Sequence, residues 1–414
     1  MKVLYIGNGL THYFNLVLSH LNREPGVELS VVVPKAGNSM IGDGVFQTKD
    51  GIDFKLIELP EVRKLLFYTS FKGLAQQLRQ LRPDVVIVAE SYLRAFVLDL
   101  PVVAAMRSTG ARLILKSIPF RYTNYQDRLK EIECSTRGFA SLPTWVNRLL
   151  ASSGLIRLFK RVVLSIDKRA LNCPDAHVNY VEAYAYWESY GVDRSRIFVT
   201  RNSPDTDMLF ATREKLEKQI SDIPKNPQRL LHVGRLVVWK RVDMLIRAFS
   251  KVRRSFPSAE LVIVGNGPEL EALKALSESL DLGTSVSFPG GVYDQTTLGK
   301  FCMDSTLYVM AGMGGLSIND AMCFGLPVLC SVGDGTEKFL VREGENGRFF
   351  SDGDEDDLEE KILWLLNNPE KMAAMGKRSE QIIRNEVNIH TVIGGYMMAL
   401  NNVHDGNRSR ALPT

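Results

Sequence analysis

The fold of this chain is decided by the stretch RLLHVGRLVVWKRVDMLIRAF, which runs from Arg229 to Phe249. Its first five residues form a short apolar run that is typical of a buried strand, and a glycine ends that run. From Val242 onward, apolar residues recur at helical spacing. A strand, a glycine loop and a helix in this order indicate one repeat unit of a parallel sheet.

The same alternation recurs on both sides of this stretch. In the second half it predicts strands at Leu261–Val264, Ser285–Phe288, Leu307–Val309 and Pro327–Cys330, and helices at Glu269–Ser279, Glu355–Leu366, Pro369–Asn385 and Ile389–Asn402. In the first half it predicts strands at Lys2–Ile6, Glu28–Val33, Phe54–Glu58, Asp84–Val88 and Arg112–Lys116, and helices at His12–Asn22 and Tyr68–Leu81. The predicted fold class is therefore α/β, with two Rossmann-like domains.

The length of the chain, 414 residues, also predicts two domains. A single hydrophobic core stops growing near about 250–300 residues. The strand pattern restarts after Asn202-Ser203-Pro204-Asp205, a turn-forming run that is typical of a connection. We therefore expect an N-terminal domain over 1–204 and a C-terminal domain over 205–386.

The composition limits the class of protein. Hydrophobic residues make up 45% of the chain, charged residues make up 24%, and the net charge is +4, which indicates a mildly basic globular protein. A nucleic-acid-binding protein normally carries a denser basic stripe, so we expect no nucleic-acid partner. The five cysteines show no Cys-x-x-Cys spacing, and no apolar run reaches about 18 residues. We therefore expect no disulfide framework, no metal site, no transmembrane helix and a cytoplasmic location.

The first strand is followed by Gly7-Asn8-Gly9. Glycines at such a turn let the backbone approach a bound group near a helix N-terminus. A dinucleotide-binding fingerprint needs a third glycine where this chain has His12, which argues against NAD or FAD. The alternative is a strand-to-helix turn that binds nothing.

Two cations, Arg235 and Lys240, follow the strand Arg229–Val233. Arginine offers a planar fork for phosphate oxygens, and lysine offers a point charge. Held at the carboxyl end of a strand, the pair could bind a diphosphate and stabilise it as a leaving group without a metal. The alternative is a solvated loop with ordinary surface charges.

A glycine-dense run leads into a helix within Ala311–Met322. Its backbone N–H groups suit a phosphate. Asp320 lies one turn into the helix and could accept hydrogen bonds from ribose hydroxyls. The alternative is a tight turn followed by an acid that complements the helix dipole.

Together these segments resemble the retaining glycosyltransferase family 4, which has the GT-B architecture of two Rossmann-like domains facing each other across a cleft. The stretch from Gly234 to Phe249 resembles the family's Gly-Arg-x4-Lys-Gly-x-Asp segment, and Gly265-Asn266-Gly267-Pro268 resembles its Gly-x-Gly-Pro segment. Gly315–Val328 is similar to the signature Gly-Leu-x3-Glu-Ala-x3-Gly-x-Pro-Val. The resemblance extends from Arg229 to about residue 350 and is weak before that.

The resemblance implies a role for individual residues. Arg235 and Lys240 match the pair that holds the donor diphosphate, and they are the expected catalytic residues. Asp320 matches the second, ribose-binding glutamate of the family's Glu-x7-Glu motif. The other expected donor contacts are Gly9, Gly265, Val292, Gly314, Gly315, Leu316 and Ser317.

The resemblance also implies the reaction. A nucleotide diphosphate sugar, with UDP as the expected nucleotide, would donate its sugar with retention to a glycan or lipid-linked acceptor in surface-glycan assembly. No metal and no other cofactor are expected. The closing helix, about 387–414, would return to the first domain.

One position departs from the family. Gly312 stands where the first glutamate of Glu-x7-Glu would stand, so the carboxylate that normally touches the donor sugar is missing. This observation keeps open one alternative to a divergent active transferase, a sugar-nucleotide-binding scaffold without activity. A further alternative, which rests on the fold, is another enzyme of the same architecture, such as a sugar-nucleotide epimerase.

Several acidic and basic positions have weaker patterns. Glu90 and Lys116 end strands of the first half, and we expect them to contact the acceptor or the sugar, with ordinary loop charges as the alternative. Asp205-Thr206-Asp207 mimics the Asp-x-Asp metal motif of another glycosyltransferase fold, but it lies in the connection and is interpreted as turn chemistry. The acidic run 352–357 is interpreted as a helix cap rather than a calcium loop.

The segment Arg121–Arg169 mixes basic and apolar residues, among them Arg157, Leu158 and Arg161. Basic amphipathic segments lie on anionic membrane surfaces. We therefore expect peripheral contact with the inner face of the cytoplasmic membrane, to which Lys64–Tyr68 could add. The alternative is a set of helices that pack on the first domain.

Overall fold

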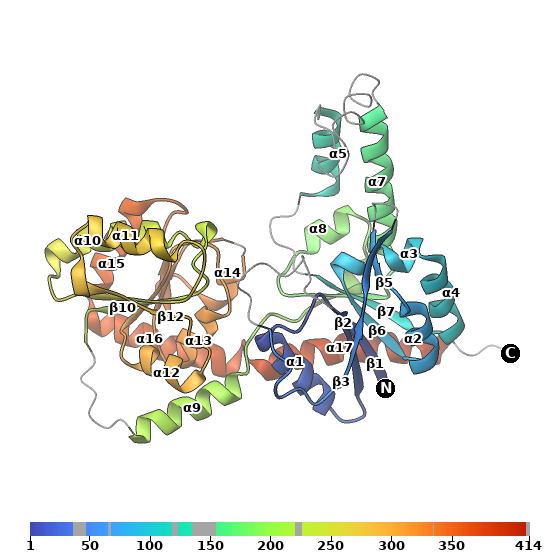
Figure 1. Ribbon diagram of the computed structural model, residues 1–414, viewed down its shortest axis with the longest axis horizontal. Helices are drawn as coiled ribbons and strands as arrows, with labels where there is room; N and C mark the ends of the chain where they lie inside the picture. The colour runs from blue at the N-terminus through green and yellow to red at the C-terminus, as the bar shows by residue number, and fades with distance from the viewer. Residues whose placement is uncertain are drawn as a thin grey trace. The chain divides into compact units, whose positions relative to one another are not determined.

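The computed structural model describes residues 1–35, 47–64, 68–117, 123–134, 155–219, 226–333 and 335–410. The chain divides into two units (Figure 1). Unit 1 comprises Met1–Thr200 with Ile393–Thr414, and unit 2 comprises Arg201–Val392. Each unit holds one parallel sheet, which confirms the α/β class. The sequence analysis had placed the boundary after residue 204, close to this division.

Unit 1 is built on a seven-stranded sheet in the order β3-β2-β1-β6-β7-β8-β9. Its strands are β1 Lys2–Ile6, β2 Glu28–Pro34, β3 Lys55–Leu59, β6 Val85–Ala89, β7 Arg112–Ser117, β8 Ala176–Asn179 and β9 Ile197–Val199. Its helices include α1 His12–Arg23, α2 Leu74–Leu81, α3 Ala95–Leu98, α4 Leu100–Thr109, α5 Tyr125–Cys134, α7 Leu155–Asn172 and α8 Tyr184–Ser189. Every residue of β6 is buried, as expected of a strand that has helices on both faces of its sheet.

The predicted helix Tyr68–Leu81 is wrong in its first part. Tyr68–Phe71 forms strand β5, which pairs antiparallel with β4, Glu61–Lys64. The helix starts only after Gly73, whose φ of 86° lies in the left-handed region that favours glycine. Aromatic and β-branched residues before that glycine favour a strand, and helical spacing starts after it.

Unit 2 is built on a six-stranded sheet in the order β12-β11-β10-β13-β14-β15. Its strands are β10 Arg229–Val233, β11 Glu260–Val264, β12 Val286–Gly290, β13 Leu307–Met310, β14 Val328–Cys330 and β15 Gly347–Phe349. Its helices are α9 Thr206–Gln219, α10 Val242–Ser255, α11 Leu270–Ser279, α12 Gln295–Met303, α13 Ser317–Cys323, α14 Glu337–Leu340, α15 Glu355–Leu366 and α16 Pro369–Asn385, and α17 Ile389–Arg410 begins in unit 2 and continues into unit 1.

The apolar residues of β10 serve two hydrophobic cores. Leu230 packs in a cluster with residues of α10 and α15. Leu231, the next residue, packs in a second cluster with residues of α9, α13 and α16. Successive side chains of a strand point to opposite faces, so the short apolar run predicted a strand covered on both sides.

The strand order of unit 2 reverses at β10. The chain runs outward from β10 to β11 and β12, and then returns to β13 on the other side of β10. In open parallel sheets, ligands bind outside the carboxyl ends of the strands at such a reversal. The reversal in unit 1 lies between β1 and β6. These two edges are therefore where the topology favours binding sites.

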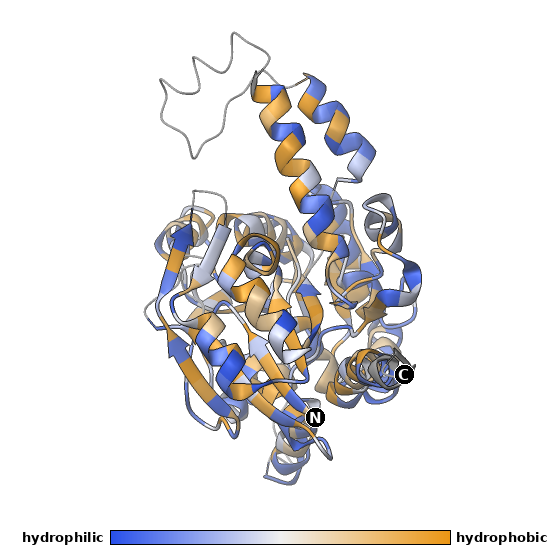
Figure 2. Cartoon of the chain, turned by 90° about the vertical axis from the view of Figure 1, so that its right-hand side faces the viewer, coloured by the Kyte–Doolittle hydropathy of each residue, from blue (hydrophilic) through white to orange (hydrophobic). Residues whose placement is uncertain are grey.

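Helices α5 and α7 project from the sheet of unit 1 (Figure 1). Both carry hydrophilic and hydrophobic segments along their length (Figure 2). Arg161 of α7 forms an ion pair with Glu133 of α5 at 2.7 Å. Residues 121–122 and 135–154 of the basic segment, and 65–67 of its proposed extension, lie outside the described residues. Within the described ranges, every helix is too short or too polar to cross a membrane.

Candidate functional site

Three glycine loops lie side by side at the carboxyl edge of the unit 2 sheet. The Gly234 N–H donates to the carbonyl of Val264 at 3.0 Å, and the Gly265 N–H donates to the carbonyl of Gly290 at 2.9 Å. A Cβ on Gly265 would overlap with the Gly234 carbonyl oxygen. Glycine at 265 is therefore required for the close approach of these loops, and Val292 follows the last of them.

Lys240 connects the loop after β10 to the loop after β13. Its side chain is only 8% exposed. Its Nζ donates to the carbonyl oxygens of Met313 at 2.7 Å and Gly314 at 2.6 Å. The Met313 N–H donates in turn to the carbonyl of Trp239 at 3.1 Å. The lysine is therefore held in place at the reversal of strand order.

Arg235 belongs to the same loop after β10. Its guanidinium carbon lies 5.8 Å from the centroid of the Trp239 ring. Trp239 itself is exposed at this edge. Both cations expected from the sequence therefore occur in the loop at the carboxyl end of β10.

The backbone around Gly312 accounts for the missing carboxylate. A Cβ at this position would overlap with the carbonyl oxygen of Trp239 and lie 2.7 Å from the carbonyl carbon of Lys240. A glutamate there would displace the backbone that carries Lys240. The glycine is therefore coupled to the position of the lysine.

Asp320 lies on α13, which begins at Ser317. Burial raises the pKa of its carboxyl group to about 7. The described residues supply no hydrogen bond or ion pair to this carboxylate. Nearby, the hydroxyl of Tyr308 lies 2.8 Å from the Ser317 Oγ. A carboxylate without a donor can accept hydrogen bonds from hydroxyl groups of a ligand.

His232 is a buried polar residue at the same edge that the sequence analysis missed. Its Nδ1 lies 3.0 Å from the carbonyl oxygen of Val309, so this nitrogen carries the proton. Burial is the main cause that lowers the pKa of His232 to about 4, and the neighbouring Lys240 contributes. The histidine is therefore neutral at pH 7. Its place inside an apolar strand was the only signal in the sequence.

Glu337 is a second buried residue that the sequence analysis missed. It is the first residue of α14, and it is 0% exposed. Its carboxylate accepts hydrogen bonds from the backbone N–H groups of Gly314 at 2.9 Å and Gly335 at 2.9 Å. Gly314 is one of the predicted donor contacts, so Glu337 is bonded to the backbone of the candidate site.

The expected residues of unit 1 lie at the carboxyl edge of its own sheet. Gly9 follows β1, Glu90 begins the turn after β6, and Lys116 lies near the end of β7. The Nζ of Lys116 lies 4.1 Å from the ring centroid of Phe14 and 4.9 Å from that of Tyr180. Burial lowers the pKa of Lys116 to about 7.

The acidic run 352–357 caps a helix as predicted, whereas 205–207, predicted as a turn, forms the start of α9. Asp205 accepts a hydrogen bond from the Met208 N–H at the start of α9, at 3.1 Å. Asp207 pairs with His390 at 2.8 Å. Asp354 accepts hydrogen bonds from two backbone N–H groups at the start of α15. In the described part of the chain, no group of three or more His, Cys, Asp or Glu residues could hold a metal ion.

One segment of this chain is similar to known proteins. Residues 213–382 match the family described as glycosyl transferases group 1. An uncharacterised glycosyltransferase of Haemophilus influenzae is 31% identical over 169 residues, which are 38% of this chain and 46% of that protein. A GDP-mannose-dependent alpha-(1-6)-phosphatidylinositol monomannoside mannosyltransferase of Mycolicibacterium smegmatis is 29% identical over 196 residues, or 45% and 48% of the two chains. The chain therefore spans about half the length of these relatives.

Solved structures resemble nearly the whole chain. HepE of Anabaena in complex with UDP has a TM-score of 0.65 at 16% identity, over 97% of this chain and 100% of that one. A glycosyltransferase of Rickettsia africae has a TM-score of 0.67 at 15% identity, over 97% and 98% of the two chains. This likeness shows a GT-B-like fold with two parallel sheets. The segment 213–382, which matches the family model, carries Arg235, Lys240 and Asp320.

Proposed function

We propose that this protein is a retaining, metal-independent glycosyltransferase that moves a sugar from a nucleotide diphosphate donor to a glycan or lipid-linked acceptor. The observation that carries this proposal is the attachment of Lys240 to the loop after β13. That contact holds a cation at the reversal of strand order, within the segment that matches the family.

In this proposal, Arg235 and Lys240 bind the donor diphosphate and neutralise it as the sugar leaves. Because backbone carbonyls already hold the lysine, the charge needs no reorganisation during the reaction, which is how fixed charges lower a barrier. Asp320 would accept hydrogen bonds from the ribose. The backbone near Gly265 and Val292 would contact the base, and Gly9, Gly314, Gly315, Leu316 and Ser317 would complete the donor contacts.

We propose UDP as the nucleotide of the donor. Support comes from solved structures of similar fold, since HepE of Anabaena has been crystallised with UDP and with UDP-glucose. The mycobacterial relative is named as GDP-mannose-dependent. A binding screen should therefore include both nucleotides.

Unit 1 would bind the acceptor. Lys116 and Glu90 lie at the carboxyl edge of its sheet, where ligands of parallel sheets bind. A lysine that is partly removed from water and held between two aromatic rings can contact an acceptor oxygen. The projecting helices α5 and α7 would bring this unit to an anionic membrane surface that carries the acceptor.

The test is sugar transfer by Arg235→Ala and Lys240→Ala variants. Each should lower turnover by roughly 100-fold or more, because a preorganised charge is removed from the leaving group. Arg241→Ala is the matched control, since Arg241 lies next to Lys240 but pairs with Asp352 at 2.8 Å. It should keep most of the activity. Normal turnover in either of the first two variants would contradict the proposal.

Gly312 favours one alternative, a protein that binds sugar nucleotides without transferring the sugar. The missing carboxylate removes a group that the related transferases use on the donor sugar. This alternative expects nucleotide binding that depends on Arg235 and Lys240, with no transfer and no isomerisation of any donor tested. The binding screen and the transfer assay together separate the two functions.

A further inference from the structure

We propose that Glu337 is a positioning residue that holds the loop 312–315 in the form that meets the donor diphosphate. This inference rests on the proposed function, because it concerns how that donor site is built. Glu337 contributes no direct contact to the donor in this proposal. It acts through the backbone of Gly314 and, through that backbone, on Lys240.

The first step of the argument is the pair of contacts at Gly314. The N–H of Gly314 donates to the Glu337 carboxylate at 2.9 Å. The carbonyl of Gly314 accepts from the Lys240 ammonium at 2.6 Å. One residue is therefore held by a carboxylate at its N–H and by an ammonium at its C=O. This arrangement sets the direction of both neighbouring peptide groups.

The second step is the space around the loop. A Cβ on Gly314 would lie 2.5 Å from the Glu337 Oε1, and a Cβ on Gly333 would lie 2.6 Å from the Cα of Met313. A Cβ on Gly315 would lie 3.3 Å from the Lys240 Nζ. The loop is therefore packed closely against Glu337, and a side chain at position 315 would press on the Lys240 ammonium.

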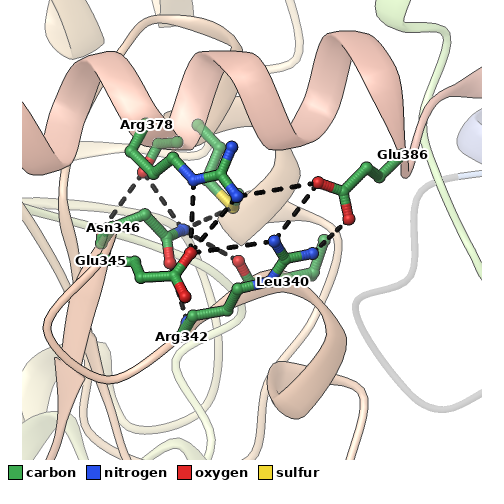
Figure 3. A network of polar contacts seen from close by, with 8 residues as sticks. Leu340, Arg342, Glu345, Asn346, Arg378 and Glu386 are labelled. Carbon is green, nitrogen blue, oxygen red and sulfur yellow. Dashed lines mark hydrogen bonds and ion pairs between the residues drawn. The ribbon is translucent and has the colours of Figure 1, made fainter.

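The third step is the anchoring of α14, the helix that Glu337 begins. The Asn346 Nδ2 donates to the carbonyl of Leu340, the last residue of α14, at 2.9 Å. The N–H of Arg342 donates to the Asn346 Oδ1 at 2.7 Å. Arg342 forms an ion pair with Glu386 near the end of α16 (Figure 3). These contacts hold α14 in place, and with it the Glu337 carboxylate.

The fourth step is electrostatic. Burying a carboxylate costs free energy unless hydrogen bonds compensate the loss of water around it. Glu337 accepts from the backbone N–H groups of Gly314, Gly333 and Gly335. These bonds fix the peptide group on the N-terminal side of Gly314, while Lys240 holds the carbonyl on its other side. The Glu337 carboxylate therefore fixes the position of the Lys240 ammonium. Its loss should change the affinity for the diphosphate rather than the affinity for the nucleoside.

The test compares the affinities for UDP and UMP in wild type and Glu337→Gln, with GDP and GMP measured alongside. The change keeps the shape of the side chain and removes its charge. We expect affinity for the diphosphate to fall by about tenfold, as for the loss of a charged hydrogen bond, and affinity for the monophosphate to stay the same. A purely structural role would weaken both nucleotides equally.

Glu343→Gln is the matched control. The Glu343 carboxylate, in the same unit, accepts hydrogen bonds from the Phe349 N–H at 2.6 Å and the Arg348 Nε at 2.9 Å, and neither partner belongs to the loop 312–315. The ratio of UDP affinity to UMP affinity in this variant should equal that of the wild type. Gly314→Ala is a second variant in case Glu337→Gln does not fold, because the added Cβ pushes the loop away from the carboxylate. It should show the same selective loss.

The outcomes separate the two proposals. Equal weakening of both nucleotides, or an unchanged ratio in both variants, would overturn the role of Glu337 and leave the proposed function standing. Failure of the wild-type protein to bind any nucleoside diphosphate would overturn the proposed function and the role of Glu337 with it. A selective loss of diphosphate affinity in either variant would support the inference.

Discussion

At the scale of single residues, the charge of Asp320 is set by its surroundings. Burial raises the pKa of this carboxyl group to about 7, well above the ordinary range of an aspartate. The native protein therefore keeps the proton between about pH 4 and pH 7, whereas the unfolded chain has lost it. Ionised Asp320 costs stability in the native state, and a ligand that donates hydrogen bonds to it would offset that cost.

Asp320→Asn should consequently raise the melting temperature more at pH 8 than at pH 5. The favourable contribution of a group with a raised pKa is present below its ordinary pKa and is lost as pH rises through its native pKa. Thermal unfolding of both proteins at the two pH values checks this. Asp357→Asn is the control: hydrogen bonds from Ser351 lower the pKa of Asp357, so this variant should lower the melting temperature by about the same amount at both pH values. An equal change in melting temperature at both pH values would contradict the raised pKa of Asp320.

Candidate site residues could be predicted only where they stand at a recognisable spacing in the sequence. Arg235, Lys240 and Asp320 stand at fixed spacings after predicted strands, and the structure places them at the carboxyl edge of one sheet. His232 and Glu337 carry no such spacing. Their importance lies in partners from other elements, such as the N–H of Gly314, which a linear pattern does not show.

At the scale of elements, α7 carries a mixed basic and apolar surface. Leu158 is 58% exposed and Val162 is 49% exposed, and Arg157 and Arg161 lie beside them in the helix. Exposed apolar residues next to cations are typical of helices that lie on anionic membranes. Salt screens the attraction between these cations and an anionic membrane surface, so such binding weakens as ionic strength rises.

Leu158→Ser combined with Val162→Ser should therefore reduce binding to phosphatidylglycerol vesicles. Co-sedimentation of wild-type protein with these vesicles is expected, with little binding to phosphatidylcholine vesicles or at high salt. Met398→Ser, which changes another exposed apolar residue on α17, is the control and should bind like wild type. If the wild-type protein does not co-sediment with anionic vesicles, the peripheral-membrane proposal is wrong.

Elements were predictable where periodicity extends over several turns or where strands are buried on both faces. The helices α15 and α16 form close to their predicted bounds, as do β10 and β11, and α10 begins at its predicted start, Val242. The hairpin of β4 and β5 was missed because its strands are short and pair with each other outside the main sheet. The short edge strands β9 and β15 were also missed, since three residues carry little periodic signal.

At the scale of the whole molecule, each unit has its own core and its own sheet. A donor that binds unit 2 should therefore protect the backbone N–H groups near its site from hydrogen exchange. Hydrogen exchange in the presence of UDP should slow at residues 234–240 and 311–320, which flank the reversal of strand order. The Arg235→Ala variant should lose this protection. Protection confined to unit 1 would contradict the placement of the donor site.

The sequence by itself determined the α/β class, the two-unit plan and the glycine loops with their cations, because these depend on local periodicity and on spacing within one strand–loop–helix unit. Only the tertiary structure showed that Lys240 is held by Gly314, that Glu337 holds the other side of that residue, and that Gly312 leaves no room for a side chain. These facts depend on contacts between segments far apart in the chain. Such contacts arise only when the parallel sheet brings the ends of its strands to one edge.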